Sequence, residues 1–165
     1  MNFELIHLLS ESGFVGDVPV ARLQKSCEDV PRVQGVYLIV RTSDCPVHFL
    51  TISSGGHFKG RDPTVTVRTL EERWLDRPKV LYIGKAGGNG QRATLRERLH
   101  TYMQFGRGKP KAHWGGRYIW QLEDAGALRV FWKPTPADVP RHVEQGLLTE
   151  FNQQYGQLPF ANLRT

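Results

Sequence analysis

A set of seven residues, spread over most of the sequence, carries the chemical groups that cleavage of a phosphodiester bond requires. Tyrosine and lysine side chains can give or take a proton, and an arginine can hold a phosphate. A lone carboxylate can bind a divalent metal ion. In chain order the seven residues are Tyr37, Tyr82, Lys85, Arg98, Tyr102, Glu150 and Asn162.

A helical pattern surrounds Arg98. Leu95, Leu99 and Met103 recur every four residues and form a stripe that must face the core. Arg98 and Tyr102 are also four residues apart, so they stand one above the other at the margin of that stripe. There both can reach one anionic group, and the planar fork of an arginine suits a phosphate. The alternative is an arginine stem that covers the core edge beside a tyrosine with an exposed hydroxyl.

A second helical pattern, near the C-terminus, contains two acidic candidates. Val143, Leu147 and Phe151 mark its buried face and place Glu150 at the margin of that face. Glu144 falls in the first turn, where the helix dipole favours an acid, so we expect it to be structural. A carboxylate at a core edge needs a partner, which a salt bridge to an arginine would supply. The alternative partner for Glu150 is Mg²⁺ or Mn²⁺, completed by waters and substrate phosphate oxygens.

The order and spacing of the seven residues resemble the GIY-YIG nuclease family, whose name records two tripeptides. Here these read Gly35-Val36-Tyr37 and Tyr82-Ile83-Gly84, and the resemblance covers roughly residues 35–165. It implies a divalent-metal-dependent endonuclease that hydrolyses DNA phosphodiester bonds, with RNA left open as a substrate. It also implies Mg²⁺ or Mn²⁺ as the cofactor, with Glu150 as the single protein ligand.

The resemblance also implies roles for the other residues. Tyr37 would act as the general base toward the attacking water, with Lys85 lowering its effective pKa, because a free tyrosine is a poor base at neutral pH. Tyr82 would pack and position groups in the site. Arg98 would stabilise the pentacovalent phosphate, with Tyr102 helping to orient water or phosphate. The residues expected to support the site are Gly35, Gly84 and Asn162.

Basic residues concentrate in the middle of the chain. Between Lys85 and Ile119, eight Lys and Arg residues, among them Arg92, stand against one acid. This segment therefore has a charge of +7, the remaining residues sum to about −1, and the whole chain has a net charge of +6. Such a stripe is expected for a phosphate-backbone partner, and a surface made basic for solubility is the alternative. The residues expected to bind nucleic acid are Arg96, Arg107, Lys109, Lys111, Lys59 and Arg61.

The pattern predicts one α/β (α+β) domain over residues 1–165, with a small central, mainly antiparallel sheet flanked by helices. Residues 1–30 form an N-terminal extension, and residues 41–79 form an insert between the two tripeptides. A glycine-rich turn is expected at residues 87–90. Strands are expected at 35–40, 80–85, 117–122 and 128–133, and helices at 3–10, 20–27, 94–104 and 139–155, the last capped by Thr135 or Asp138.

The insert is the part of the chain least like the family. Residues 47–53 and the following Ser54-Gly55-Gly56 suggest a hairpin arm, and Thr69 to Glu72 reads as a capping box that opens a short helix. The insert either contacts substrate through Lys59, Arg61 and His57 or is a loop without a role. Because no DNA-binding module is visible, specificity would come from the insert, the first 30 residues, a homodimer or a partner protein.

Composition narrows the class of protein. With 39% hydrophobic and 23% charged residues, the chain matches neither a disordered nor a membrane protein, and its start lacks a signal-peptide pattern. Two cysteines without a Cys-x-x-Cys pair predict reduced thiols, a cytoplasmic protein and no zinc site, and a single disulfide is the alternative. Two alternatives to an enzyme remain: a catalytically inactive nucleic-acid-binding module of the same fold, or an interaction domain that uses its basic face.

Overall fold

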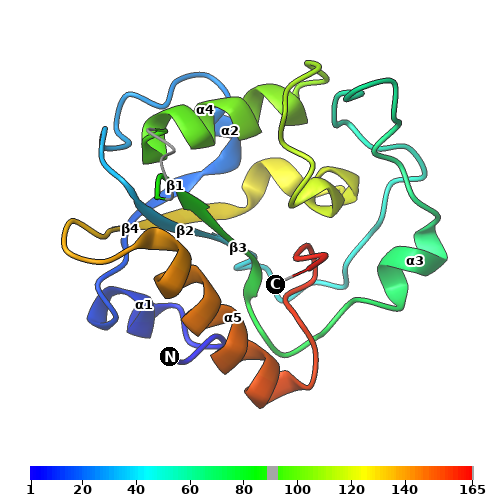
Figure 1. Cartoon of the computed structure of the whole chain (residues 1–165). Helices are drawn as coiled ribbons and strands as arrows, with labels where there is room; N and C mark the ends of the chain where they lie inside the picture. The colour runs from blue at the N-terminus through cyan, green and yellow to red at the C-terminus, as the bar shows by residue number, and fades with distance from the viewer. Residues whose placement is uncertain (89–92, 165) are drawn as a thin grey trace.

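The chain folds around a four-stranded antiparallel sheet (Figure 1). The computed structural model describes residues 1–88 and 93–164, so Asn89, Gly90 and Arg92 of the expected turn and basic segment lie outside the described residues. The strand order is β1-β4-β2-β3, and the bounds in that order are Val15–Pro19, Arg129–Pro134, Gly35–Val40 and Val80–Ala86. The expected α+β class is confirmed, as are the strands at 35–40, 80–85 and 128–133, whereas β1 is additional to the expected elements.

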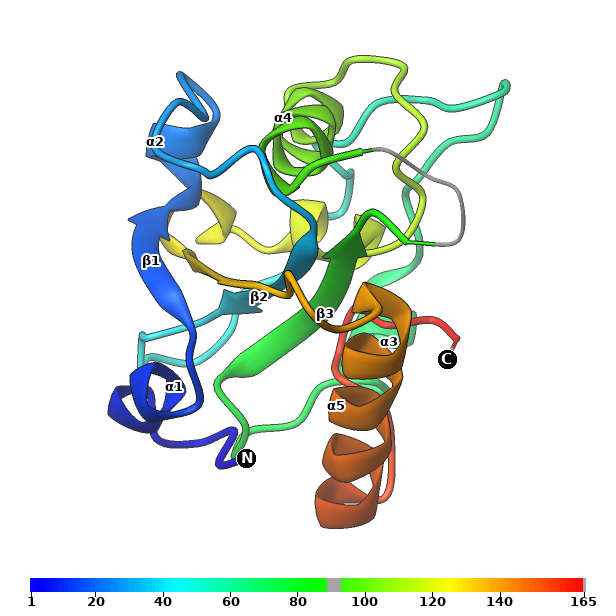
Figure 2. The same ribbon diagram turned by 60° about the vertical axis from the view of Figure 1, so that its left-hand side comes forward.

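Helices cover both faces of the sheet (Figures 1 and 2). One face carries α2 (Val20–Leu23) and α4 (Leu95–Gly106), and the other carries α1 (His7–Glu11) and α5 (Pro140–Tyr155). Since successive strand residues point to opposite faces, the central strand β2 contributes to both cores. Tyr37 and Ile39 pack in the cluster that includes α4, and Leu38 packs in the cluster that includes α5.

The two long helices begin at well-defined residues. The side chain of Thr94 caps α4 in a capping box with the glutamate three residues later, which stabilises the first turn. Pro140 stands in the first turn of α5 and Val139 takes the N-cap position, so neither Thr135 nor Asp138 caps this helix. Both helices therefore form near their predicted bounds, although the predicted cap of α5 is wrong.

The expected strand at 117–122 is a 3₁₀ helix instead. This helix, η1 (Arg117–Gln121), begins after Gly116, whose φ of 75° is left-handed, and the shorter η2 (Ala125–Ala127) follows it. Tyr118, Ile119 and Trp120 are all buried. A strand with one face in water would alternate buried and exposed side chains, so the continuous burial has no place at a sheet edge.

The insert lies over η1 and does not form the expected hairpin arm. The buried side chain of Gln121 accepts a hydrogen bond from the N–H of Val65 (2.8 Å) and donates to the carbonyls of Leu50 (3.0 Å) and Val65 (2.9 Å). At the base of the insert, the buried Arg41 pairs with Asp124 at 2.7 Å. These bonds hold the insert against the body of the domain.

The short helix of the insert starts earlier than the sequence suggests. It is α3 (Val67–Glu71), and the side chain of Thr66 accepts a hydrogen bond from the N–H of Thr69 at 3.2 Å. Thr66 is therefore the N-cap residue, and the predicted capping box of Thr69 and Glu72 is wrong. The two possible caps, Thr66 and Thr69, are both threonines three residues apart, and the local sequence alone does not distinguish them.

The two outer strands differ in how their free edges are covered. In β1 the pairing with β4 shifts at Asp17, which has a left-handed φ of 57° and accepts a hydrogen bond from Arg129 at 2.7 Å. Along β3 the C-terminal segment lies against the strand, and the N–H of Ala161 donates to the carbonyl of Leu81 at 2.9 Å. The edge of β3 is therefore where the last residues of the chain meet the sheet.

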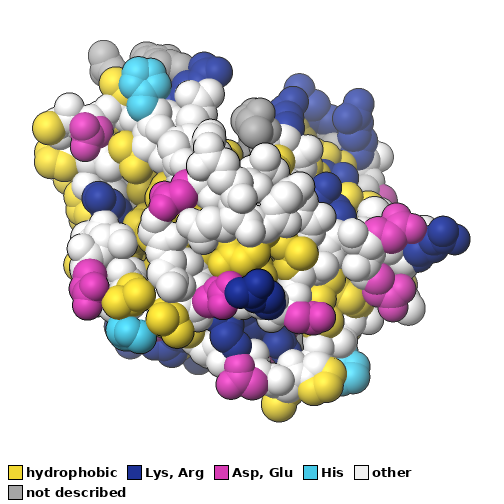
Figure 3. All heavy atoms as spheres, turned by 90° about the horizontal axis from the view of Figure 1, so that it is seen from below, with side chains coloured by type: hydrophobic (Ala, Val, Ile, Leu, Met, Phe, Trp, Pro, Cys, Tyr) yellow, Lys and Arg dark blue, Asp and Glu magenta, His cyan; other side chains and the backbone are white. Residues whose placement is uncertain are grey.

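Charged side chains are unevenly distributed over the surface. Figure 3 views the molecule from the side of α1 and α5; acidic and basic side chains are mixed across its centre, and Lys and Arg gather toward one edge. Among the described residues, no helix is long and apolar enough to cross a membrane.

Candidate functional site

Three tyrosines, one of them on α4 itself, meet between α4 and the sheet. The ring centroids of Tyr37 (β2) and Tyr82 (β3) are 6.0 Å apart, and Tyr102 (α4) lies 6.5 Å from the first and 5.8 Å from the second. Tyr37 and Tyr102 are fully buried, and Tyr82 lines a cavity. The structure thus brings together the three tyrosines that the sequence singled out.

The glycines of both tripeptides make room for this packing. A Cβ on Gly84 would lie 2.6 Å from the hydroxyl oxygen of Tyr37, its cross-strand neighbour. A Cβ on Gly35 would lie 2.3 Å from the carbonyl oxygen of Lys133 on β4. Real Cβ atoms do not approach other atoms so closely, so both positions exclude larger residues.

A histidine that is not among the predicted site residues completes the buried cluster. His113 stacks on Tyr102 at 4.1 Å, and its Nε2 lies 3.4 Å from the hydroxyl of Tyr37. Its Nδ1 is buried without a hydrogen-bond partner among the described residues. Burial lowers the pKa of His113 well below the ordinary range, with a further lowering by the charge of Arg98, so the imidazole is neutral. In the sequence, the feature that could have indicated a role for His113 was its position in a basic loop directly before Trp114.

Burial also determines the direction in which the pKa values of the three tyrosines shift. It raises the pKa of Tyr37, against a lowering by the charge of Arg98 and by a hydrogen bond with Tyr82. Burial raises the pKa values of Tyr82 and Tyr102 still further. The cation that lowers the Tyr37 pKa is therefore Arg98 and not the expected Lys85, burial outweighs it, and the phenols remain neutral near pH 7.

Tyr102 and Arg98, which were expected to reach the same anionic group, make different interactions. The hydroxyl of Tyr102 donates to the carbonyl of Gly116 at 2.8 Å, so it fixes the loop before η1. Arg98 is half-buried on α4, and its charge acts on Tyr37, Tyr82 and His113. Arg98 also acts on the carboxylate of Glu144, so its charge is shared between this acid and any phosphate that binds nearby.

The acid at this site is Glu144, not Glu150. The Nζ of Lys85 lies 3.3 Å from a carboxylate oxygen of Glu144, and both side chains line the cavity at the edge of β3. Burial raises the pKa of Glu144, against lowering by the charges of Lys85 and Arg98. Glu150 instead forms an ion pair with the N-terminal ammonium of Met1 and does not line this cavity.

The position of the buried face of α5 explains why Glu144, and not Glu150, lines the cavity. Leu148 and Phe151 are buried, whereas Val143 is only partly buried. Glu144 precedes Leu148 by four residues and Phe151 by seven, so it stands in line with the buried face, and Glu150 lies outside it. The first-turn interpretation of Glu144 is thus insufficient, because its side chain is only 19% exposed.

The cavity beside β3 has a volume of about 510 Å³ and a basic rim. It draws on β3, the loop before η1, α5, the C-terminal segment and the insert, which lie far apart in the sequence (Figure 2). One acid faces four cations on its wall. The lining residues are Arg61, Tyr82, Lys85, Trp114, Gly115, Arg117, Glu144, Leu148, Asn162, Leu163 and Arg164.

The insert reaches this cavity through Arg61. Lys59 and Gly60, with left-handed φ values of 53° and 72°, form a two-residue turn. Phe58 and Arg61 close it with two backbone hydrogen bonds of 3.1 Å. Lys59 is exposed at the tip, and the neighbouring His57 lies 3.8 Å from a carboxylate oxygen of Asp62.

The insert also packs against the basic loop that follows α4. The N–H of Gly56 donates to the carbonyl of Phe105 at 2.8 Å, and a Cβ on Gly56 would lie 2.0 Å from the carbonyl oxygen of Lys109. Gly56 thus permits close approach and is not a flexible turn. Lys109 and Lys111 are exposed on the loop, so they and the insert belong to one continuous surface.

The two remaining predicted DNA contacts lie on the other flank of α4. Arg96 donates to the carbonyls of Val30 (2.7 Å) and Glu28 (2.6 Å), and Arg107 donates to the carbonyl of Gln24 (3.1 Å). These arginines tie α4 to the segment after α2. Their guanidinium groups are at least partly committed to backbone carbonyls.

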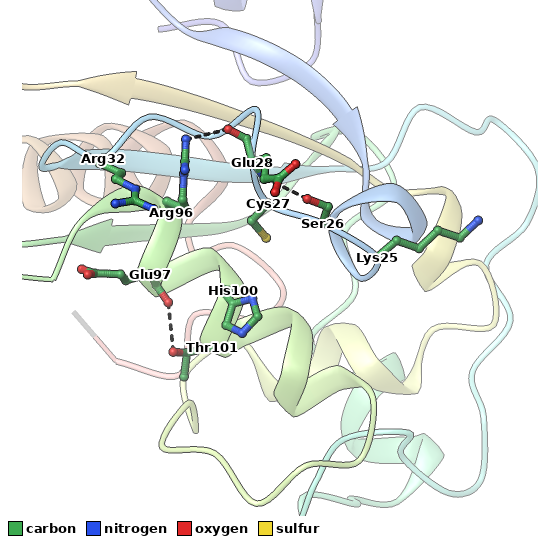
Figure 4. A pocket seen from close by; sticks show the side chains of 9 residues that line it. All are labelled: Lys25, Ser26, Cys27, Glu28, Arg32, Arg96, Glu97, His100 and Thr101. Carbon is green, nitrogen blue, oxygen red and sulfur yellow. Dashed lines mark hydrogen bonds between the residues drawn. The ribbon is translucent and has the colours of Figure 1, made fainter.

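This flank carries a second cavity of about 510 Å³ (Figure 4). Cys27, Arg96 and His100 are among its lining residues. Burial raises the pKa of the Cys27 thiol to about 11, so this sulfur is protonated and a poor nucleophile. Acids and cations line this cavity too, but no salt bridge among the described residues joins two of them; they are Lys25, Glu28, Arg32, Arg96 and Glu97.

The metal-ligating side chains beside β3 determine which kind of metal ion could bind there. Among residues 1–88 and 93–164, no group of three or more His, Cys, Asp or Glu side chains could hold a metal ion. Glu144 is one carboxylate beside a basic cavity, which fits a Mg²⁺ or Mn²⁺ ion that takes its other ligands from water and substrate phosphate.

Comparisons of the chain with protein-family models, with curated proteins and with solved structures give no match. The interpretation of this site accordingly depends on its own geometry and chemistry.

Proposed function

We propose that this protein is a divalent-metal-dependent endonuclease that hydrolyses DNA phosphodiester bonds. The observation that carries the proposal is the pairing of Lys85 with Glu144 in a basic cavity that also contains Tyr82. A partly buried acid, a cation and a phenol in one cavity, with Arg98 nearby, can bind a phosphate and transfer a proton. The cavity's basic rim supports a polyanionic substrate, and RNA remains a second substrate to be tested.

Glu144 would hold the metal ion, in place of the expected Glu150. When bound, Mg²⁺ or Mn²⁺ would stabilise negative charge on the phosphate and promote ionisation of a bound water. In the metal-free protein Lys85 balances the charge of Glu144. The ammonium of Lys85, which lines the same cavity, would hold a substrate oxygen.

The proton of the attacking water would leave through a line of neutral groups. Tyr82 lies at the cavity, Tyr37 lies behind it within hydrogen-bonding reach, and His113 Nε2 is 3.4 Å from the hydroxyl of Tyr37. Because the phenols stay neutral, Tyr37 would relay a proton and not act as a preformed tyrosinate. His113 would hold the Tyr37 hydroxyl in place and would not keep the proton, because burial and the charge of Arg98 disfavour a protonated imidazole, so the proton would return to solvent.

The insert and the loop after α4 would hold the DNA outside the cavity. Lys59, Lys109 and Lys111 are exposed on this continuous surface, and Arg61 lines the cavity. Such contacts to phosphates position a duplex without specifying its sequence, so specificity would require a homodimer, a partner protein or base contacts from the insert. The free Cys27 and Cys45 fit a reducing compartment, so we assign this activity to the cytoplasm.

Incubation of the purified protein with supercoiled plasmid DNA in Mg²⁺, Mn²⁺ or EDTA tests the proposal. We expect nicked and linear products with either metal and intact plasmid in EDTA. Retention of DNA on a gel without cleavage in any metal would indicate a binding module that has the fold but not the activity. Neither retention nor cleavage, for DNA or RNA, would leave an interaction domain with a basic face.

A further inference from the structure

Arg117 is held rigidly in the wall of the cavity beside β3. Its guanidinium carbon lies 4.7 Å from the ring centroid of Trp114 and 4.9 Å from that of Tyr118. Two aromatic contacts of this length fix the plane of the guanidinium group. The side chain therefore loses little further conformational entropy when it binds a ligand.

Arg117 has no anionic partner among the described residues. None of the ion pairs formed by residues 1–88 and 93–164 includes it, and its Nε is buried without a hydrogen-bond acceptor. Burial lowers the pKa of Arg117, the direction expected for a cation that has lost water without gaining an anion. Because Nε is buried, a ligand in the cavity would accept from the other N–H groups of this half-buried guanidinium, and its anionic charge would balance that of Arg117.

Arg117 and Glu144 both line the cavity, but Glu144 pairs with Lys85, whereas the guanidinium of Arg117 lies over Trp114 and Tyr118. The pKa of Glu144 responds to Lys85, Arg98 and Arg141, whereas that of Arg117 responds to Tyr118 and Arg73. The cavity thus has two points of positive charge, one beside Glu144 and one beside Trp114. Its volume of about 510 Å³ is in the range of sites that hold ligands larger than a single phosphate, roughly 300–1,000 Å³.

We infer that Arg117 binds a second phosphate of the same strand, next to the phosphate that is cleaved, so that the preferred substrate presents at least two consecutive phosphates. This inference rests on the proposed function. Arg61 and Arg164, which line the same cavity, extend the positive charge beyond Arg117. The planar guanidinium offers parallel N–H donors to two phosphate oxygens, which a lysine cannot do.

A comparison of two substrates tests the inference. Bis(4-nitrophenyl) phosphate has one phosphate, and a single-stranded 12-nucleotide DNA has many. With Arg117→Ala we expect KM for the oligonucleotide to rise about tenfold with kcat little changed, and the rate on the single diester to be unaffected. The exposed Arg22→Ala, paired with Asp29 far from this wall, is the matched control and should change neither. An equal loss on both substrates would show that Arg117 acts on the cleaved phosphate or on folding, and would overturn the inference.

Binding without metal separates this inference from the proposed function. In EDTA, Arg117→Ala should weaken binding of the same oligonucleotide about tenfold and reduce the salt dependence by about one counterion. Arg117→Lys keeps the charge and the stem but not the planar fork, so it should fold normally and bind several-fold less tightly than the original protein. Unchanged binding in both variants would overturn the inference. Absence of cleavage by the unaltered protein would count against the proposed function only.

Discussion

The side-chain amide of Asn162 accepts a hydrogen bond from the N–H of Ile83 at 2.9 Å and donates one to the carbonyl of Ile83 at 2.8 Å. It therefore pairs with β3 as a neighbouring strand would. On this strand Tyr82 directly precedes Ile83 and Lys85 follows it by two residues, so Asn162 fixes the part of β3 that lines the cavity. Asn162 supports the site through the backbone.

Asn162→Ala should lower the free energy of unfolding by about 1–3 kcal/mol, because it leaves a buried N–H and carbonyl of Ile83 unpaired. Urea denaturation measures this change, and the exposed Asn152→Ala on α5 is the control. Any loss of cleavage should parallel the loss of folded protein. A variant as stable as the original but inactive would give Asn162 a chemical role instead.

Glu144→Gln should reduce metal-dependent cleavage by on the order of 10²-fold or more, because an amide is a far weaker metal ligand than a carboxylate. Glu150→Gln removes a charge from the same helix but only breaks the ion pair with Met1, so its cleavage rate should stay near the original. Plasmid nicking at several Mg²⁺ concentrations compares them. The reverse ranking would restore Glu150 as the metal ligand.

The neutral state of His113 predicts a loss of stability in acid. Its pKa is lowered by folding, so as the pH falls below about 6.5 the unfolded chain binds a proton that the folded protein does not. Stability from this residue is present above that pH and decreases by on the order of 1 kcal/mol for each pH unit below it. His113→Gln should flatten the difference in unfolding free energy between pH 7 and pH 5. An equally steep decrease in the variant would assign the effect to other groups.

Lys59 and Arg61 test the insert. Their double replacement by alanine should weaken DNA binding at fixed salt and leave the rate at saturating substrate nearly unchanged, because phosphate contacts position the strand without acting on the reacting atoms. Gel retention and kcat measure the two effects. The control is Arg68→Ala on α3, an exposed arginine of the same insert that pairs with Glu72. Unchanged binding by the double variant would mean that the insert has no part in recognition.

The sequence predicted best the elements whose cause is local. The buried segments around Tyr37 and Tyr82 form the strands expected from their apolar runs, and the helix around Arg98 has the expected buried stripe. The three tyrosines meet because β2 and β3 are adjacent and α4 packs on that side of the sheet.

Features that depend on tertiary packing were not predictable in the same way. Whether Glu144 or Glu150 faces the site depends on how far α5 is rotated about its axis, and the apolar stripe was broad enough to allow both. His113 acquires its significance from stacking against Tyr102, a residue on another element. The path of the insert depends on η1, whose Gln121 side chain bonds to Leu50 and Val65 and whose backbone carbonyls accept from the N–H groups of Leu50 and Ser54.

The two outer strands of the sheet have a consequence for self-association. An exposed strand edge is a template for pairing with another chain, and bulges or covering segments prevent this. Here Asp17 distorts β1 with a left-handed residue, and the C-terminal segment occupies the free side of β3. A homodimer of this protein would therefore have to form through side-chain surfaces, and joining two sheets into a longer one is disfavoured at both ends.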